Sequence, residues 1–346
     1  MDPKAEGPEG GASVKPSIRL DKMLAHEGYG TRSDVRRLVR EGAVTVNGRT
    51  ASDPGMHVRP EEDEVLVRGR AVAYREFRYI MLHKPAGVVS ATEDARERTV
   101  LGLLPDDLRR RGLFPVGRLD KDAEGLLLLT NDGKLAHGLT SPRKAVYKIY
   151  QALVRGDADA ADAEAFAAGV ALDDGYVTMP ARLTVLASMP APALAEYAAD
   201  VGEPTEGERT SGGPGTPKAA GALDAAWAPR GAMASDEAPS EGEAGAGAIP
   251  EMRRAAQRLA EEPFLNRNAW EEAVRDGAVV SWVEVALREG KFHQVKRMFE
   301  AIGKKVLYLR RVAVGALRLD PALEPGEWRE LTPEEEEALR GQGRET

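Results

Sequence analysis

The sequence predicts an α+β protein with more than one domain. Its 346 residues exceed the size of an average domain, so two domains are expected. Segments in which apolar residues recur at helical spacing are mixed with short segments that alternate or are continuously apolar, a pattern typical of strands. A low-complexity, acidic stretch interrupts the larger, C-terminal part of this pattern.

The composition excludes several classes of protein. The chain has no cysteine, so disulfide bonds and thiolate zinc sites are ruled out. Its apolar stretches are far shorter than a membrane span, and residues 1–16, which we expect to form a disordered tail, lack the apolar region of a signal peptide. We therefore expect a cytoplasmic protein without a membrane partner. No glycine-rich phosphate loop or cluster of metal ligands occurs, so neither a cofactor nor a metal is expected.

Residues 17–70 form the first predicted domain, a small helix-helix-strand unit. Leu20, Met23 and Leu24 recur at helical spacing and predict the first helix. Thr31 and Asp34 stand in the positions of a capping box and predict the start of the second helix. The stretch "AVTVNG" then alternates as a strand does and ends in an Asn-Gly turn.

The second helix of this unit has a basic face. Val35, Leu38 and Val39 form the apolar face, and the opposite face carries Ser33, Arg36, Arg37 and Arg40. The spacing alone fits two interpretations equally: a solvated face, or arginines that follow the phosphates of a nucleic acid. The unit resembles the small RNA-binding module first known from a small-subunit ribosomal protein. That resemblance implies binding to structured RNA through Arg32, Arg36, Arg37 and Arg40.

A linker is expected at residues 71–76, and a catalytic domain at 77–333 that an insertion at 190–265 interrupts. From Ala191 to Pro250 the chain has ten acidic and three basic residues, which accounts for −7 of the net charge of −8. This stretch is rich in Ala, Gly, Pro and Ser and lacks periodicity, so we expect it to be disordered. The alternative is a small, Ala-rich folded subdomain. "EMRRAAQRLAEE" and "NAWEEAVRDG" predict short helices, and residues 334–346 predict an acidic tail.

The catalytic region contains several predicted strands and one well-defined helix. The strand segments are "YIMLHKPAGVVSA", which is broken at Lys84-Pro85 and Gly87, "GLFPVG", "GLLLLTNDG", "AVYKIYQALV" and "VVSWVEVALREG", and the leucine-rich one is expected to be buried on both faces. In "KFHQVKRMFEAIG" the apolar residues Val295, Met298, Phe299 and Ile302 form one stripe of a helix that ends at Gly303.

The loop "GRLDKDAEG" concentrates charge immediately before the buried, leucine-rich strand. Asp120 follows Arg118 by two residues, and Asp122 and Glu124 lie just beyond. A carboxylate near an arginine suits a nucleophile or a general base. Paired carboxylates also suit hydrolysis of a glycosidic bond. A third interpretation is a turn whose carboxylates only bind local backbone groups or pair with the basic residues Lys121, Arg143 or Lys144.

The ordered set "KPAGVVSATED", "GRLDKDAEGLLLLTNDG", "YKIY" and "EGKFHQVKRMF" closely resembles the RsuA-type family of bacterial ribosomal-RNA pseudouridine synthases. The resemblance implies a catalytic domain with a mixed, largely antiparallel sheet behind the small RNA-binding domain. It implies isomerisation of uridine to pseudouridine: the base is detached from its ribose, turned, and rejoined through carbon 5. The sequence differs from the residues usual in these family motifs at Ala123, Tyr147 and Ile149.

The resemblance also implies roles for individual residues. Asp120 is the catalytic aspartate, Arg118 its neighbour, Tyr150 a ring that stacks on the base, and Lys296 the basic partner in the "HQVKRM" helix. The residues expected to contact RNA are Arg19, Arg32, Ser33, Arg36, Arg37, Arg40, Asn47, Lys84, Lys148, His293, Gln294 and Arg297. The expected partner is ribosomal RNA, 16S RNA in a partly assembled small subunit, bound by a monomer. The alternatives are 23S RNA as substrate, or an RNA-binding assembly factor without catalysis.

Overall fold

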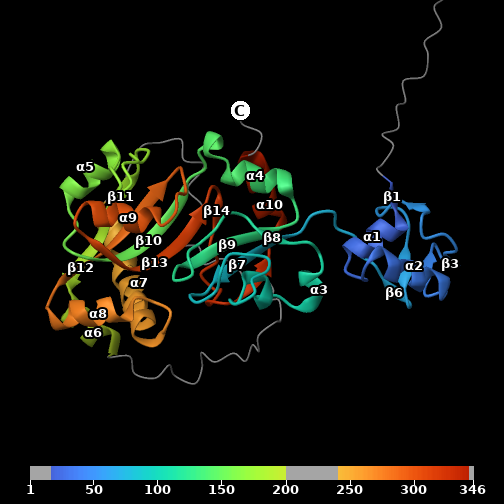
Figure 1. The fold of residues 1–346 in the computed structure, drawn as a ribbon, viewed down its shortest axis with the longest axis horizontal. Coiled ribbons are helices and arrows are strands. Elements are labelled where there is room, and N and C mark those ends of the chain that lie inside the picture. Colours follow the sequence, from blue (N-terminus) through green and yellow to red (C-terminus); the bar gives the residue numbers. More distant parts are fainter. Residues whose placement is uncertain (1–16, 200–240, 343–346) are drawn as a thin grey trace, which may run out of the picture. The chain divides into compact units, whose positions relative to one another are not determined.

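The computed structural model describes residues 17–199 and 241–342, which form two compact units (Figure 1). Among the described residues, the first unit comprises 17–76 and 106–112, and the second comprises 77–105 and the chain from 113 onward. No helix within the described ranges has the length and apolar character needed to span a membrane.

The first unit contains two helices, short strands and one further helical turn. Its elements are β1 (Ile18–Arg19), α1 (Leu20–His26), α2 (Arg32–Arg40), β2 (Val44–Val46), β3 (Arg49–Thr50), β4 (His57–Val58), β5 (Val65–Val67), β6 (Arg70–Ala71) and α3 (Asp106–Arg109). The strands form a sheet in the order β3-β2-β5-β6 and a separate β1-β4 pair.

Local signals in the sequence explain this unit. Thr31 and Asp34 form the predicted capping box at the start of α2. Asn47 and Gly48 have φ angles of 51° and 74°, the conformation that a tight hairpin turn requires. The predicted apolar residues of α1 are buried in one core with Val35 and Val39. The predicted helices, strand and turn of this unit are therefore confirmed.

The second unit is built on one large sheet with helices on it. The elements before residue 200 are β7 (Tyr79–Lys84), η1 (Val100–Leu103), β8 (Phe114–Pro115), β9 (Glu124–Thr130), α4 (Gly133–Thr140), η2 (Pro142–Lys144), β10 (Lys148–Arg155), α5 (Ala160–Ala168), β11 (Arg182–Pro190) and α6 (Ala191–Ala199). Those after residue 240 are α7 (Glu241–Glu261), α8 (Arg267–Arg275), β12 (Val279–Leu287), α9 (Gln294–Ala301), β13 (Lys305–Val314), β14 (Leu317–Arg318), β15 (Trp328–Glu330) and α10 (Pro333–Gln342).

The sheet is mixed and largely antiparallel, as the resemblance implied. Its nine strands have the main order β11-β12-β10-β13-β9-β7-β15, with β14 paired to β13 and β8 to β9. The pairing of β9 with β13 is parallel, and the other strand pairs are antiparallel. Every residue of β9 is buried, which confirms that this leucine-rich strand is covered on both faces.

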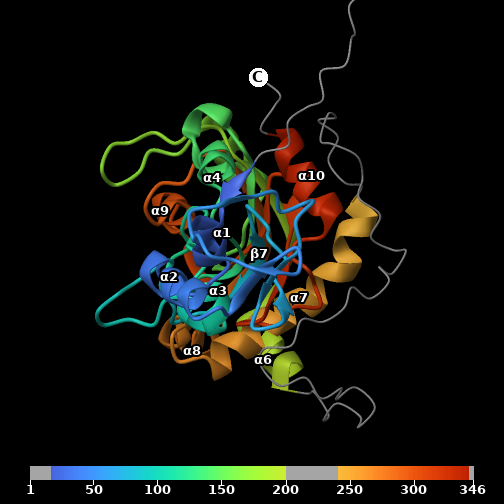
Figure 2. The same cartoon turned by 90° about the vertical axis from the view of Figure 1, so that its right-hand side faces the viewer.

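Helices α6, α7 and α8 gather at one end of this unit (Figure 1; Figure 2). Their alanines and apolar side chains pack in one core with strands β10, β12 and β13, and Met252 and Leu259 of α7 are fully buried. The prediction of disorder was therefore wrong for 191–199 and 241–250, because a charge average over this stretch concealed buried apolar residues at both ends. The two short helices predicted after it are confirmed. Residues 200–240 lie outside the described residues.

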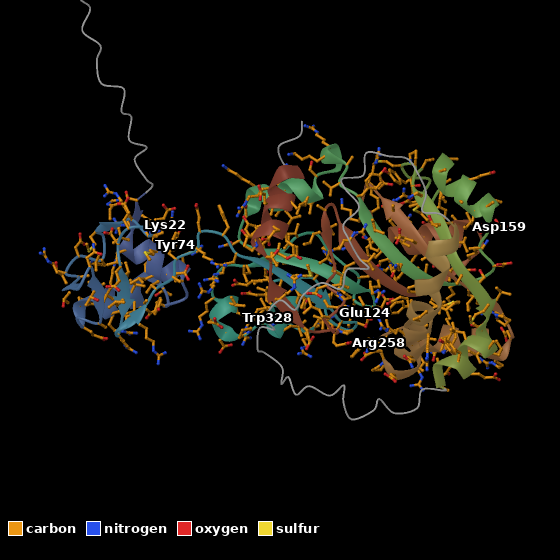
Figure 3. All side chains as sticks on the ribbon, turned by 180° about the vertical axis from the view of Figure 1, so that it is seen from behind. Lys22, Tyr74, Glu124, Asp159, Arg258 and Trp328 are labelled. Carbon is orange, nitrogen blue, oxygen red and sulfur yellow. The ribbon has the colours of Figure 1, made fainter. Side chains whose placement is uncertain are left out.

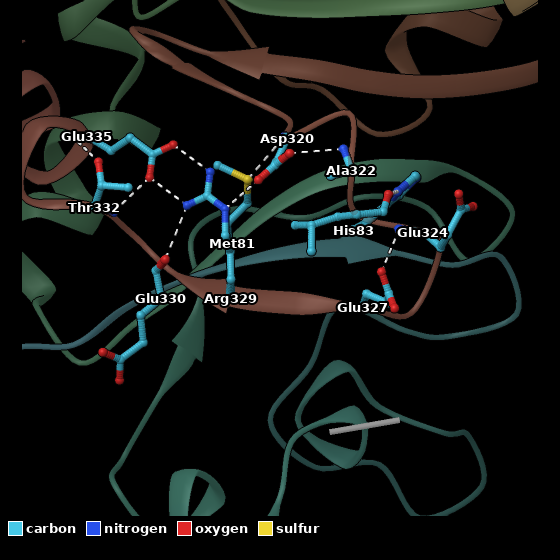
Figure 4. A network of polar contacts seen from close by, with 11 residues as sticks. Met81, His83, Asp320, Ala322, Glu324, Glu327, Arg329, Glu330, Thr332 and Glu335 are labelled. Carbon is cyan, nitrogen blue, oxygen red and sulfur yellow. Dashed lines mark hydrogen bonds and ion pairs between the residues drawn. The ribbon is translucent and has the colours of Figure 1, made fainter. Parts of the chain in front are cut away.

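The C-terminal strand and helix are tied together by Arg329. Its guanidinium, 17% exposed, pairs with Asp320 at 2.7 Å and with Glu335 at 2.7 Å (Figure 4). Leu339 of α10 is fully buried in a core that includes residues of β7 and β9. The acidic tail predicted from residue 334 is therefore, as far as residue 341, part of a helix packed on the catalytic unit.

Candidate active site

The loop between β8 and β9 presents Asp120 at the surface. The Asp120 side chain is 25% exposed. From α9, the Lys296 ammonium lies 3.6 Å from Oδ2 of Asp120, and Nε2 of His293, just before the helix, lies 3.7 Å from Oδ1. Lys296 also bonds Asp122 at 2.6 Å. Two segments that are remote in sequence thus place a partly exposed carboxylate between two basic groups.

The buried residue Lys84 hydrogen-bonds to the backbone of this loop. Lys84, at the end of β7, is fully buried, and its ammonium donates hydrogen bonds to the carbonyl oxygens of Pro85 at 2.9 Å and Ala123 at 2.8 Å. It also lies 3.4 Å from the carbonyl oxygen of Lys121. Burial lowers the pKa of Lys84 to about 8, against the opposing effect of nearby carboxylates. The prediction that Lys84 binds RNA is wrong, because its donors are directed at the backbone of the loop.

Glu124, at the start of β9, anchors the other end of the loop. It is fully buried and accepts hydrogen bonds from Arg258 of α7, from Tyr308 at 2.9 Å and from the Ala86 amide at 3.3 Å. Figure 3 shows Glu124 and Arg258 close together. Burial would raise the pKa of Glu124, but the hydrogen bonds and charge of Arg258 outweigh it, so that pKa is lowered. Asp122 thus pairs with Lys296 and Glu124 with Arg258, and not with Lys121, Arg143 or Lys144, the neighbours that the sequence offered.

Arg311 of β13 lies against the loop's backbone. It is buried, its Nε donates to the carbonyl oxygen of Leu126 at 2.9 Å, and its Nη1 lies 3.4 Å from that of Arg118. A Cβ on Gly125 would lie 2.2 Å from the Arg311 carbonyl oxygen, so only glycine fits where β9 pairs with β13. The Arg118 guanidinium is exposed and makes no ion pair within the described part of the chain, so it does not hold Asp120.

Tyr150 and Lys148 lie on β10, beside Arg311 of β13. Tyr150 is 8% exposed and lies opposite Arg311 in the sheet. Lys148 is 9% exposed, and burial together with the nearby Arg311 charge lowers its pKa to about 8. Arg311 therefore connects these two side chains to the loop that carries Asp120.

Two residues predicted to contact RNA are engaged within the protein. Gln294 is buried and donates to Glu289 at 2.6 Å, while its own oxygen accepts from the Lys291 amide. Arg297, 16% exposed, pairs with Asp173 and, at 2.7 Å, with Asp174. These hydrogen bonds raise the pKa of Arg297. The prediction of RNA contacts is therefore wrong for Gln294, and Arg297 is held in an ion-pair cluster.

In the first unit the predicted basic face of α2 is exposed at Arg32, Ser33, Arg36, Arg37 and Arg40. Two other predicted RNA contacts have partners within the unit. Arg19 forms a two-pronged ion pair with the buried Asp21, and Asn47 exchanges hydrogen bonds with Asp63 and the Glu64 amide. Arg19 thus binds the first turn of α1, and Asn47 links its own turn to Asp63 and Glu64.

The sequence did not identify Glu124, Arg258 and Arg311 as parts of one site. Glu124 was noticed only as a charge in the loop, and its arginine partner stands 134 residues away. The one signal that could have pointed to Arg311 is its place in the apolar stretch "VLYLRRVAV", because a charged residue inside a buried strand needs a polar partner.

Comparisons with known proteins give consistent descriptions. Residues 78–301 match the family model described as RNA pseudouridylate synthase, and residues 18–65 match the S4 domain. The chain is 36% identical to the Bacillus subtilis protein "Uncharacterized RNA pseudouridine synthase YtzG", over 92% of this chain and 96% of that protein. It is 30% identical to "Ribosomal small subunit pseudouridine synthase A" of Vibrio vulnificus, over 92% and 97% of the two chains.

A relative named for the other ribosomal subunit is similar to almost the same degree. "Ribosomal large subunit pseudouridine synthase B" of Bacillus subtilis is 29% identical over 93% of this chain and 95% of its own. A solved structure titled "Crystal structure of pseudouridylate synthase" is 26% identical, covers 93% of this chain and 99% of its own, and has a TM-score of 0.46.

Proposed function

Because the chain belongs to the RNA pseudouridylate synthase family and includes an S4 domain, we propose that it isomerises one uridine of 16S ribosomal RNA to pseudouridine, with Asp120 as the catalytic group. The observation that carries this proposal is the partly exposed Asp120 carboxylate between Lys296 and His293. Its loop is held from beneath by the buried residues Lys84 and Glu124. A supported carboxylate of this kind can reach a base that has been turned out of its helix.

The chemistry requires one carboxylate rather than two. Asp120 starts cleavage of the bond between ribose and uracil, either by attack on the sugar or by removal of a sugar proton. Glu124 is buried under the loop, and Asp122 is bonded to Lys296 at 2.6 Å, so we assign neither the role of a second working carboxylate. Tyr150 offers a ring for the detached uracil while it turns.

The first unit supplies affinity in this proposal. Arg32, Arg36 and Arg40 are exposed on the same helix, and guanidinium groups match phosphate oxygens in geometry. We assign this face to the backbone of structured RNA, recognised by shape and charge. The choice of small-subunit RNA rests on the "HQVKRM" wording and on relatives named for that subunit.

The test is pseudouridine mapping on unmodified 16S RNA and on reconstituted small subunits. Incubation with the wild-type protein is expected to give a single new pseudouridine, and Asp120→Asn is expected to give none. Asp122→Asn is the matched control in the same loop and should retain most of the activity. If Asp120→Asn modified the same uridine as the wild type, the assignment of the catalytic group would be wrong.

The identity of the RNA is tested separately. The relative named for the large subunit is almost as similar as the one named for the small subunit, so the same assay is run on unmodified 23S RNA. Modification of 23S RNA alone would overturn the choice of 16S RNA and leave the role of Asp120 standing.

A further inference from the structure

Phe292 is an aromatic side chain that is largely exposed at the surface of the described protein. It is 75% exposed, more than any other large apolar side chain in the described residues. It stands in the connection between β12 and α9, immediately before His293. A single exposed apolar residue is ordinary on a protein surface. The geometry around this one gives it a specific use.

The Phe292 ring is stacked on the imidazole of His293. The two ring centroids are 3.8 Å apart and the planes differ by 15°. His293 has a φ of 50°, a left-handed conformation that is uncommon outside glycine and is found at functional sites. The His293 imidazole also borders the candidate active site, because its Nε2 lies 3.7 Å from Oδ1 of Asp120. The two rings therefore form a short stack that leads from the catalytic loop to solvent.

This stack stands on a fixed support. Val295, Met298 and Phe299 bury the inner face of α9. Gln294 binds the backbone of Lys291 and the side chain of Glu289, which closes the connection that carries Phe292. The exposed ring is thus held in position by a folded element, which reduces the entropy lost when a ligand binds.

Two lysines flank the Phe292–His293 pair in the sequence. Lys291 precedes it, with its ammonium 4.6 Å from the centroid of the Tyr176 ring, and Lys296 follows in α9, with its ammonium 2.6 Å from Asp122 and 3.6 Å from Asp120. An exposed π-face suits a nucleobase, because aromatic side chains stack on bases of any kind. An apolar protein partner would require a larger exposed apolar surface than one ring offers.

We propose that the Phe292–His293 pair is a stacking platform for a nucleobase that neighbours the uridine bound at Asp120. The inference rests on the proposed function, because only an RNA substrate brings such a base to this loop. Turning a uridine out of a helix removes a stacking partner from the adjacent base, and the Phe292 ring supplies a replacement. Stacking of this kind tolerates any base, so the platform contributes affinity and position rather than sequence selection.

The test measures binding without turnover. Unmodified 16S RNA is titrated against Asp120→Asn and against the same chain carrying in addition Phe292→Ala, Phe292→Leu, Phe292→Tyr or Tyr197→Ala. Tyr197 is the control because it is an exposed aromatic residue, 40% exposed, on α6 and paired with Arg253. We expect Phe292→Ala and Phe292→Leu to weaken binding by roughly 5- to 100-fold, and Phe292→Tyr and Tyr197→Ala to bind within about threefold of their parent.

The salt dependence adds a second readout. Loss of a stacked base removes no phosphate contact, so the slope of log K against log salt concentration should be the same for Phe292→Ala and its parent. Equal binding by Phe292→Ala and the parent would overturn the platform, and so would full binding by Phe292→Leu, which has no π-face.

These outcomes are separable from those that concern the proposed function. If the wild type modifies 16S RNA and Phe292→Ala binds it normally, only the platform is wrong. If the wild type modifies neither 16S nor 23S RNA, the proposed function fails whatever the binding data show. Melting curves of each variant confirm that it is folded, which is expected for the Phe292 variants because this side chain is 75% exposed.

Discussion

Replacing Arg258 by methionine should destabilise the protein in a way that depends on pH. The change removes the charged partner of Glu124 and keeps most of the apolar length of the side chain. Glu124 is fully buried, and its remaining hydrogen bonds come from neutral groups, the Tyr308 hydroxyl and the Ala86 amide. A carboxylate in that position is costly, so in the variant it will take up a proton.

The free energy needed to protonate Glu124 in the folded variant sets the size of the destabilisation. The ordinary pKa of a glutamate is 4.5 here, and protonating it costs about 1.4 kcal/mol for each pH unit above that value. The variant should therefore lose about 3 kcal/mol at pH 7 and about 1 kcal/mol at pH 5. The sign follows from Glu124's lowered pKa in the wild type, whose stabilisation is present above pH 4.5 and is lost as the pH falls.

The assay is thermal unfolding of wild type and variant at pH 5, 6 and 7. For a domain of this size 3 kcal/mol corresponds to about 6–12 °C in melting temperature. Arg254→Met is the matched control, because Arg254 lies on the same helix, is 67% exposed and pairs with Glu251 only at the surface. It should cost less than about 1 kcal/mol. Equal losses from the two variants, or a loss from Arg258→Met that does not grow with pH, would refute the reasoning.

Three further predictions follow from other parts of the structure. Gly125→Ala places a Cβ 2.2 Å from a carbonyl oxygen and should cost more than about 3 kcal/mol in chemical denaturation, whereas Gly175→Ala, also at positive φ but with open space, should cost about 1 kcal/mol. The pKa of Lys148 is lowered to about 8, so the unfolded chain binds more protons between pH 8 and 10.5 and stability rises with pH; Lys148→Met should reduce that rise and leave the part contributed by Lys84, whose pKa is also lowered to about 8, as urea unfolding of wild type and variant at pH 8 and 10 will measure. Replacing Arg36 and Arg40 by alanine should reduce the slope of log K against log salt for RNA binding by roughly 1–2, and an unchanged slope in filter binding would contradict their phosphate role.

Elements with local signals could be predicted from the sequence. The capping box of α2 and the turn at Asn47 depend on residues at most a few positions apart, so one window contains the whole interaction. The same holds for α9, whose predicted apolar stripe is buried at Val295, Met298 and Phe299. The loop "GRLDKDAEG" could be recognised for the same reason, because its residues are contiguous in the chain.

Interactions between remote segments could not be predicted. Arg258 lies in a segment that composition identified as low-complexity, and its partner stands on the other side of residues 200–240. Lys84 has the residue type of an RNA ligand, and only its burial reveals that it binds carbonyl groups of the loop. Charge in a sequence does not distinguish a group that faces solvent from one that supports the backbone.

The three carboxylates of the loop show how environment assigns different roles to one residue class. Glu124 is removed from solvent and fixes the loop to the core through Arg258. Asp122 takes the closer position at Lys296, 2.6 Å from its ammonium, and leaves Asp120 at 3.6 Å. A lysine shared in this way stays beside Asp120 without being held in a tight pair with it, so the carboxylate can still turn toward a substrate. The three carboxylates of this loop therefore differ in role: Glu124 anchors the loop, Asp122 binds Lys296 directly, and Asp120 is the group proposed for the chemistry.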